Sequence, residues 1–199
     1  MTLLASLSKM KQLQSFGCQG LHIRREQYSY VFDTSCLTKL RSVTIDSCSP
    51  THATWLKYAP LLQELEISNC DSMEEVIKEE EVEDCSIKNN ENMDSSSSFV
   101  FSSLVILRLC NLPRLESIHK ASLLFPSLRY IGITSCPKLN KLPLDSNSAK
   151  HKLEHIHGPQ DWWDKLEWDD PAAKHKFQSK FEDPFPIVRL REWFHHREQ

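Results

Sequence analysis

The chain has 199 residues, of which 40% are apolar and 9% aromatic, and a formal net charge of −3 at pH 7. This length suits one domain, or one small solenoid with a tail, and the apolar content is sufficient for a packed core. The small negative charge gives no electrostatic basis for binding nucleic-acid phosphates, so nucleic acid is not expected as a partner.

Two features of the sequence predict a cytoplasmic protein. Residues 1–13 contain short apolar pieces that Lys9 and Lys11 interrupt, so neither a signal peptide nor a membrane span is expected there. The cysteines are odd in number, widely spaced and include no CxxC pair, which argues against a disulfide framework or a zinc site and favours a reducing compartment. They are Cys18, Cys36, Cys48, Cys70, Cys85, Cys110 and Cys136.

In chain order, the first predicted elements are weak and the strong ones repeat. Residues 1–36 are expected to hold one or more incomplete repeats, with a strand marked by Leu21 and Ile23. From Leu40 a partial copy of an apolar pattern runs as far as Thr51. Complete copies begin at Leu62, Leu104 and Leu128, with apolar or small residues at offsets 0, 3, 5, 8, 11 and 14. The complete copies comprise Leu62, Leu65, Ile67, Cys70, Met73 and Val76; Leu104, Leu107, Leu109, Leu112, Leu115 and Ile118; and Leu128, Ile131, Ile133, Cys136, Leu139 and Leu142.

The spacing within each copy predicts an α/β leucine-rich-repeat solenoid over residues 37–144. The step of two is strand alternation, and the steps of three suit turns on the convex side, so stacked copies form a short parallel sheet on the concave face. The convex side is expected to be irregular or helical. An amphipathic helix is the alternative, but the segments SVTID, ELEIS and YIGIT are rich in β-branched residues, and Pro60, Pro126 and Pro137 would interrupt long helices.

The spacing between copies is uneven because an insertion follows Val76. Its sequence is acidic at first and then rich in Asn and Ser, with too few apolar residues to bury. We expect a disordered loop at about residues 78–98, tolerated between repeats; a partner-binding or phosphorylated segment is the sharper alternative.

A cluster of Trp162, Trp163 and Trp168 follows the repeats. The last repeat of a solenoid exposes its apolar edge, so we expect residues 145–182 to form a Trp-rich C-terminal cap. An aromatic cage or nucleic-acid stacking platform is the alternative, which the neighbouring carboxylates disfavour. No pattern is recognised in the tail at residues 183–199.

Catalytic, cofactor and metal sites are not expected. His151, His155 and His157 form an HxxxHxH cluster, but no neighbouring carboxylate or cysteine has metalloenzyme spacing. The chain has no GxSxG, HExxH or glycine-rich phosphate loop, and carboxylates near the tryptophans have no spacing that indicates an acid/base pair.

The strand alternation also predicts which side chains face outward on the concave surface, the default surface for a protein partner. Arg108 and Tyr130 are the strongest candidates among them because both residue types are common in binding hot spots. The predicted strip comprises Ser42, Thr44 and Asp46; Glu64, Glu66 and Ser68; Ile106, Arg108 and Cys110; and Tyr130, Gly132 and Thr134.

Four segments together resemble a known family: LLQELEISNCDSMEEVI, FSSLVILRLCNLPRLESI, FPSLRYIGITSCPKLNKLPLDSNSA and WWDKLEWDD. They are similar to the C-terminal leucine-rich-repeat region of plant coiled-coil, nucleotide-binding, leucine-rich-repeat disease-resistance proteins. The resemblance covers roughly residues 1–181 and is most specific from Leu61 to Asp170.

The resemblance implies a protein-recognition module at the sensor end of an intracellular immune receptor. Its implied partners are a pathogen effector or a host protein that the effector modifies, and the nucleotide-binding domain that the repeats hold inactive. The chain lacks the phosphate-binding loop and the coiled-coil domain of such receptors, so it is not expected to bind nucleotide. A stand-alone leucine-rich-repeat adaptor, or a protein like the substrate receptor of a ubiquitin ligase, is the alternative.

Overall fold

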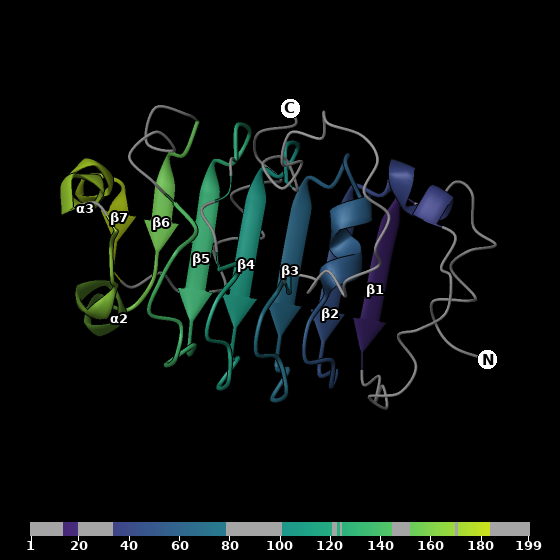
Figure 1. The fold of residues 1–199 in the computed structure, drawn as a ribbon, viewed down its shortest axis with the longest axis horizontal. Coiled ribbons are helices and arrows are strands. Elements are labelled where there is room, and N and C mark those ends of the chain that lie inside the picture. Colours follow the sequence, from purple (N-terminus) through teal and green to yellow (C-terminus); the bar gives the residue numbers. More distant parts are fainter. Residues whose placement is uncertain are drawn as a thin grey trace, which may run out of the picture.

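The computed structural model describes residues 14–19, 34–78, 101–120, 123, 125–144, 152–169 and 171–183. Within these residues, strands β1 to β7 form one parallel sheet whose spatial order is the chain order (Figure 1). This arrangement confirms the predicted α/β leucine-rich-repeat solenoid. The strands are β1 (Ser15–Gln19), β2 (Ser42–Asp46), β3 (Glu64–Ser68), β4 (Ile106–Cys110), β5 (Tyr130–Thr134), β6 (His155–His157) and β7 (Phe181–Glu182).

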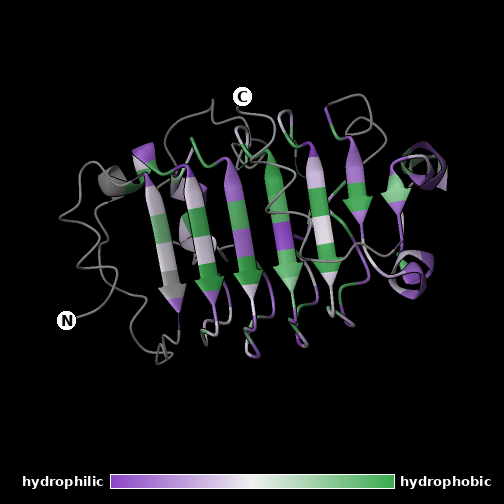
Figure 2. Cartoon of the chain, turned by 180° about the vertical axis from the view of Figure 1, so that it is seen from behind, coloured by the Kyte–Doolittle hydropathy of each residue, from purple (hydrophilic) through white to green (hydrophobic). Residues whose placement is uncertain are grey.

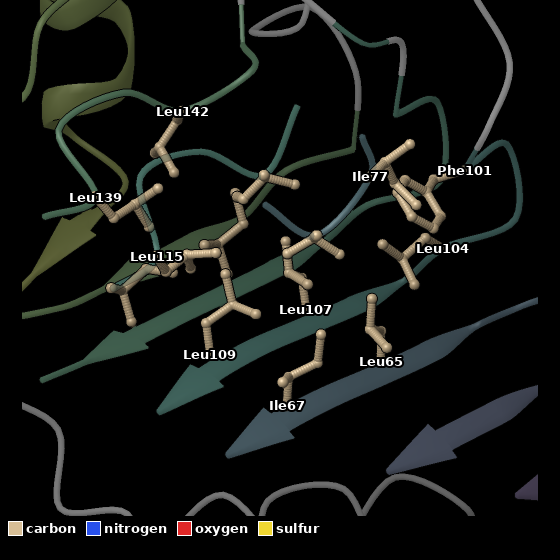
Figure 3. Close-up of a cluster of buried hydrophobic side chains, with 14 of the residues drawn as sticks. Leu65, Ile67, Ile77, Phe101, Leu104, Leu107, Leu109, Leu115, Leu139 and Leu142 are labelled. Atoms are coloured by element: carbon tan, nitrogen blue, oxygen red, sulfur yellow. The ribbon is translucent and has the colours of Figure 1, made fainter. Parts of the chain in front are cut away.

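The core lies on one face of this sheet and consists of the repeated apolar positions. Every position of the three complete copies has a side chain at most 3% exposed. Figure 3 shows Leu107 and Leu109 of β4 beside Leu65 and Ile67 of β3, the residues with which they are paired in register. Hydrophobic and hydrophilic bands alternate along β2, β3 and β5 (Figure 2), as expected for strands with one buried face.

A tight turn follows each of β2 to β5. Ser47, Asn69, Asn111 and Ser135 have φ of 52° or 53°, in the left-handed region, directly after the strand. Asn tolerates this conformation better than most residues, which explains its use at this position. The buried cysteine that follows in three repeats donates its thiol to a strand carbonyl, as Cys70 does to Ser68 O at 3.2 Å.

The other side of the solenoid carries short helices and turns. Two 3₁₀ helices, η2 (Thr34–Lys39) and η3 (Thr54–Tyr58), precede β2 and β3. The insertion interrupts neither the sheet nor its register, because Glu64 of β3 pairs with Ile106 of β4. The predicted loop at 78–98 lies outside the described residues except for Lys78. None of the helices described is long and apolar enough to cross a membrane.

At the N-terminal end, the described residues include a strand that the sequence analysis does not identify. Within the described residues, the strand that begins the sheet is β1 at Ser15–Gln19, which pairs in parallel with β2. The predicted strand at Leu21 and Ile23 lies outside the described residues. The strand is hard to recognise because Phe16 and Cys18 stand at register positions where the complete copies have Leu or Ile. The ring of Phe16 packs edge-on against Trp55 at 6.1 Å.

At the C-terminal end, the sheet continues beyond the leucine spacing, which stops after Leu144. Residues 152–183, here called the C-terminal unit, add β6, helix α2 (Gln160–Lys165), helix α3 (Pro171–Gln178) and β7. Trp162 and Trp163 are buried, and the Trp162 Nε1 donates to Leu139 O at 2.8 Å. Glu167 N donates to Asn140 O at 2.7 Å. The C-terminal unit is thus hydrogen-bonded directly to the last complete repeat.

Gly158, just after β6, allows this close packing. A Cβ there would lie 2.6 Å from Cε3 of Trp162 and 3.3 Å from Ile133 O. The Trp162 ring is held by its hydrogen bond to Leu139 and cannot move aside freely. We therefore expect Gly158→Ala to lower the free energy of unfolding by about 1–3 kcal/mol, measured by urea denaturation. Gly17 has no atom within 4 Å of an added Cβ, so Gly17→Ala is the matched control, and equal losses in both variants would contradict the packing described.

Candidate protein-binding surface

The outward-facing side chains of the strands form three rows across the concave face. Registered pairing places each predicted residue beside its counterpart on the next strand. The concave strip, as defined here, consists of Ser42, Glu64, Ile106 and Tyr130 in the first row; Thr44, Glu66, Arg108 and Gly132 in the second; and Asp46, Ser68, Cys110 and Thr134 in the third. β6 and β7 extend two of these rows with His155, His157 and Glu182.

In the third row, Asp46 is the centre of a hydrogen-bond network. Its Oδ1 accepts from Ser68 Oγ and Asn69 Nδ2, both at 2.8 Å, and its Oδ2 accepts from Gln19 Nε2 at 3.1 Å. Asn69 Oδ1 in turn accepts from Asn111 Nδ2 at 2.8 Å. This row therefore joins four neighbouring strands or their turns through side chains, in addition to the backbone ladder.

This network predicts a pH-dependent contribution to stability. Hydrogen bonds from Asn69 and then Ser68 lower the pKa of Asp46 below 3.8. A carboxyl group with a depressed pKa stabilises the fold above its unfolded pKa, and this stabilisation is lost as the pH falls through the folded pKa. Asp46→Ala should lower the free energy of unfolding by about 1 kcal/mol near neutral pH.

The difference in free energy of unfolding between Asp46→Ala and the wild type should shrink well below pH 3.8, because the wild-type carboxyl group is protonated there. Thermal unfolding of both proteins across this range measures it. A difference that stays constant with pH would show that the carboxylate charge has no part in the network.

In the second row, Arg108 and Glu66 form an ion pair. Arg108 Nη1 lies 3.4 Å from Glu66 Oε2, and the two side chains are 20% and 39% exposed. A pair this accessible contributes little to stability, typically below about 1 kcal/mol. Its charged groups are therefore available to a partner without disturbing the core.

Two side chains of the first row are buried, although the strand alternation predicts that they are exposed on the concave face. Ile106 and Tyr130, paired across β4 and β5, are each 3% exposed. The Tyr130 ring lies over Gly132, where an added Cβ would be 3.0 Å from its hydroxyl, and it stacks on His157 at 5.1 Å. Tyr130 is covered because the sheet continues into β6, which the leucine spacing does not indicate.

At the C-terminal end of the strip, the side chains of His155, His157 and Glu182 lie close together. The sequence does not predict this cluster. His155 Nδ1 lies 2.9 Å from Glu182 Oε1, and His157 Nε2 lies 3.6 Å from Glu182 Oε2. Burial lowers the pKa of His157, while Glu182 acts in the opposite direction. His151 lies outside the described residues. The sequence signal was the alternation in His155–His157, but Glu182 is too distant in sequence to be associated with it.

The charged side chains of the concave strip are biased toward negative charge. Asp46, Glu64 and Glu66 outnumber the single arginine of the strip, Arg108. Cys70 and Cys136 are poorly suited to nucleophilic chemistry, because burial raises the pKa of both thiols to about 11. This arrangement suits recognition of a complementary surface.

A family model of plant disease resistance protein RPS2-like leucine-rich repeats matches residues 7–157. The chain belongs to this family. It is a leucine-rich-repeat region related to plant disease resistance proteins, as the resemblance in the sequence predicted. The residues that match this RPS2-like family model include strands β1 to β6.

Curated relatives from Arabidopsis thaliana support the same family. The chain is 37% identical to disease resistance protein SUMM2, over 72% of this chain and 15% of SUMM2. It is 35% identical to disease resistance protein RPS5, over 72% of this chain and 16% of RPS5. The chain spans less than a quarter of the length of these and the other relatives compared. No solved structure gives a significant match.

Proposed function

We propose that this RPS2-like repeat chain is a protein-recognition module in plant defence, of the kind that forms the sensor end of an intracellular immune receptor. The observation that carries this proposal is the concave strip: a registered polar surface over a separate apolar core, in a chain related to disease resistance proteins. Its role is to bind and not to catalyse.

The charges of the strip favour a partner with basic groups. Glu64 is exposed, Glu66 is 39% exposed on its side chain, and both stand beside β4 in consecutive rows. A lysine or arginine of the partner can pair with these carboxylates, while Arg108 can donate hydrogen bonds to a carboxylate or a carbonyl of the partner. Such complementarity sets specificity and the rate of encounter more than total affinity.

The partner proposed is a pathogen effector or a host protein that an effector modifies. The nucleotide-binding domain of a receptor is a further protein that the same surface would contact. The proposal requires that binding of each of these proteins depends on side chains of the strip and not on the acidic sequence at 78–98.

Two charge-swapped variants test the proposal with unchanged net charge. Glu66→Lys/Arg108→Glu reverses the pair on the strip, and Glu116→Lys/Lys138→Glu reverses a pair at 3.6 Å outside the strands. Each protein is expressed in leaf tissue as a fusion to a biotin ligase, with and without pathogen challenge, and the labelled proteins are quantified by mass spectrometry.

We expect the wild type and the Glu116/Lys138 variant to label a common set of proteins that includes defence components. The Glu66/Arg108 variant should not label this set. Equal labelling by all three proteins would contradict recognition through the strip. Far-UV circular dichroism of the purified variants confirms that each is folded before the comparison.

A further inference from the structure

The histidine–glutamate cluster at the C-terminal end of the concave face has the composition of a metal site. His155, His157 and Glu182 each offer a ligand atom, and these three atoms lie within 4.8 Å of one another. Two imidazoles with one carboxylate suit a borderline divalent ion such as Zn²⁺.

The backbone fixes the three side chains on one face. His155 and His157 are two residues apart on β6, so both face outward while Ile156 between them is fully buried. Glu182 is paired with His157 across β6 and β7. Strand alternation and parallel register therefore place all three ligand side chains at neighbouring positions on one face.

The position of β7 is held by packing on its other face. The Phe181 ring, next to Glu182, stacks on the buried Trp163 with ring centroids 4.4 Å apart. Ile156 N donates to Lys180 O at 2.8 Å, and Lys180 Nζ donates to Leu153 O at 2.6 Å. A ligand on a strand anchored in this way loses little conformational freedom when it binds a metal.

The two distances between an imidazole nitrogen and the carboxylate are close to those around a single ion. Tetrahedral Zn²⁺ with bonds of about 2.0–2.1 Å to nitrogen and oxygen places neighbouring ligand atoms about 3.4 Å apart. The two imidazole–carboxylate separations are 2.9 Å and 3.6 Å. Glu182 is 51% exposed and His155 33% exposed, so the remaining coordination position faces solvent.

We propose that His155, His157 and Glu182 form a Zn²⁺ site at the C-terminal end of the concave face. Three protein ligands leave one position open for water or for a group of a bound protein. The site is independent of the proposed recognition function, because it needs only the C-terminal unit and no partner.

Zinc titration of the untagged full chain tests this site by calorimetry, with Co²⁺ absorption as a second readout of four- or five-coordinate geometry. Glu182→Gln and His155→Gln each remove one ligand with little change in volume. The matched control is His175→Gln, an exposed histidine on α3 outside the cluster. Thermal unfolding without metal establishes that each variant is folded.

We expect one zinc equivalent whose affinity falls at least about tenfold in both cluster variants and is retained in His175→Gln. Saturating zinc should raise the melting temperature of the wild type and of the control but not of the cluster variants, because the ion binds only the folded state. The absence of a zinc equivalent in the wild type, its loss in His175→Gln, or its retention in either cluster variant would overturn the proposal.

Discussion

Replacing Trp163 by alanine is expected to lower the free energy of unfolding by about 3–5 kcal/mol. The Trp163 side chain is fully buried, its ring stacks on Phe181, and its Nε1 donates to Gln178 Oε1 at 3.0 Å. The alanine variant loses the buried apolar surface and leaves a cavity between α2, α3 and β7. Urea denaturation followed by circular dichroism measures the loss.

This variant also tests whether the C-terminal unit caps the repeats, as we propose. If the unit shields the core edge, the whole sheet unfolds at lower denaturant in one transition, because stacked repeats are stable only with their neighbours. Tyr58→Ala is the control, since that ring is 42% exposed, and its expected effect is within about 0.5 kcal/mol. A Trp163→Ala loss below about 1 kcal/mol, or a separate transition for the unit alone, would contradict the capping role.

Replacing Leu107 by alanine should destabilise the chain by about 2–5 kcal/mol. Leu107 is 1% exposed in β4, the middle strand of the sheet, and is paired in register with Leu65 of β3 and Ile131 of β5. Figure 3 shows it beside Leu65. The loss is large because a cavity in the middle of a stack weakens the contact between the repeats on either side.

Arg108, the next residue along β4, is the matched control for Leu107. Its side chain faces the opposite side of the sheet, where it pairs with Glu66. Arg108→Ala should change the free energy of unfolding by less than about 1 kcal/mol. Similar losses for the two variants in chemical denaturation would show that the alternation assigned to β4 is wrong.

The repeat positions could be predicted from the sequence because they obey a rule that acts within each copy. Strand alternation places Leu65 and Ile67, two apart, on the same face, and only stacking with a neighbour can bury them. The buried Cys70 follows at offset 8 of the same pattern. These positions can therefore be identified from the spacing within one copy, without knowledge of contacts distant in sequence.

The end of the sheet could not be predicted in the same way. From Leu153 the pattern continues with Ile156 at offset 3, but Gly158 stands at offset 5 where the complete copies have Ile or Leu. β7 has only two residues and is located by the packing of Phe181 against Trp163, a contact distant in sequence. Because the sequence does not indicate these strands, Tyr130 is expected to be exposed on the concave face, and Glu182 cannot be associated with His155.

On the concave face, the sequence gives the direction of each side chain but not its exposure. Ser42, Thr44 and Glu66 are partly exposed as expected. The large side chains of Ile106 and Tyr130, which are paired across β4 and β5, are buried. Exposure depends on the size of the neighbours on the next strand, which the spacing within one copy does not specify. Arg108 is therefore the better candidate for contact with a partner.

The dissociation constant of a partner recovered by the labelling experiment tests the central claim most directly. It is measured by calorimetry for the wild type, for Arg108→Ala and for the Glu116→Lys/Lys138→Glu control. Recognition through the concave strip predicts at least about a tenfold weaker complex for Arg108→Ala and an unchanged constant for the control. Equal affinity of the wild type and Arg108→Ala, with weaker binding by the control, would place recognition outside the strip and contradict the claim.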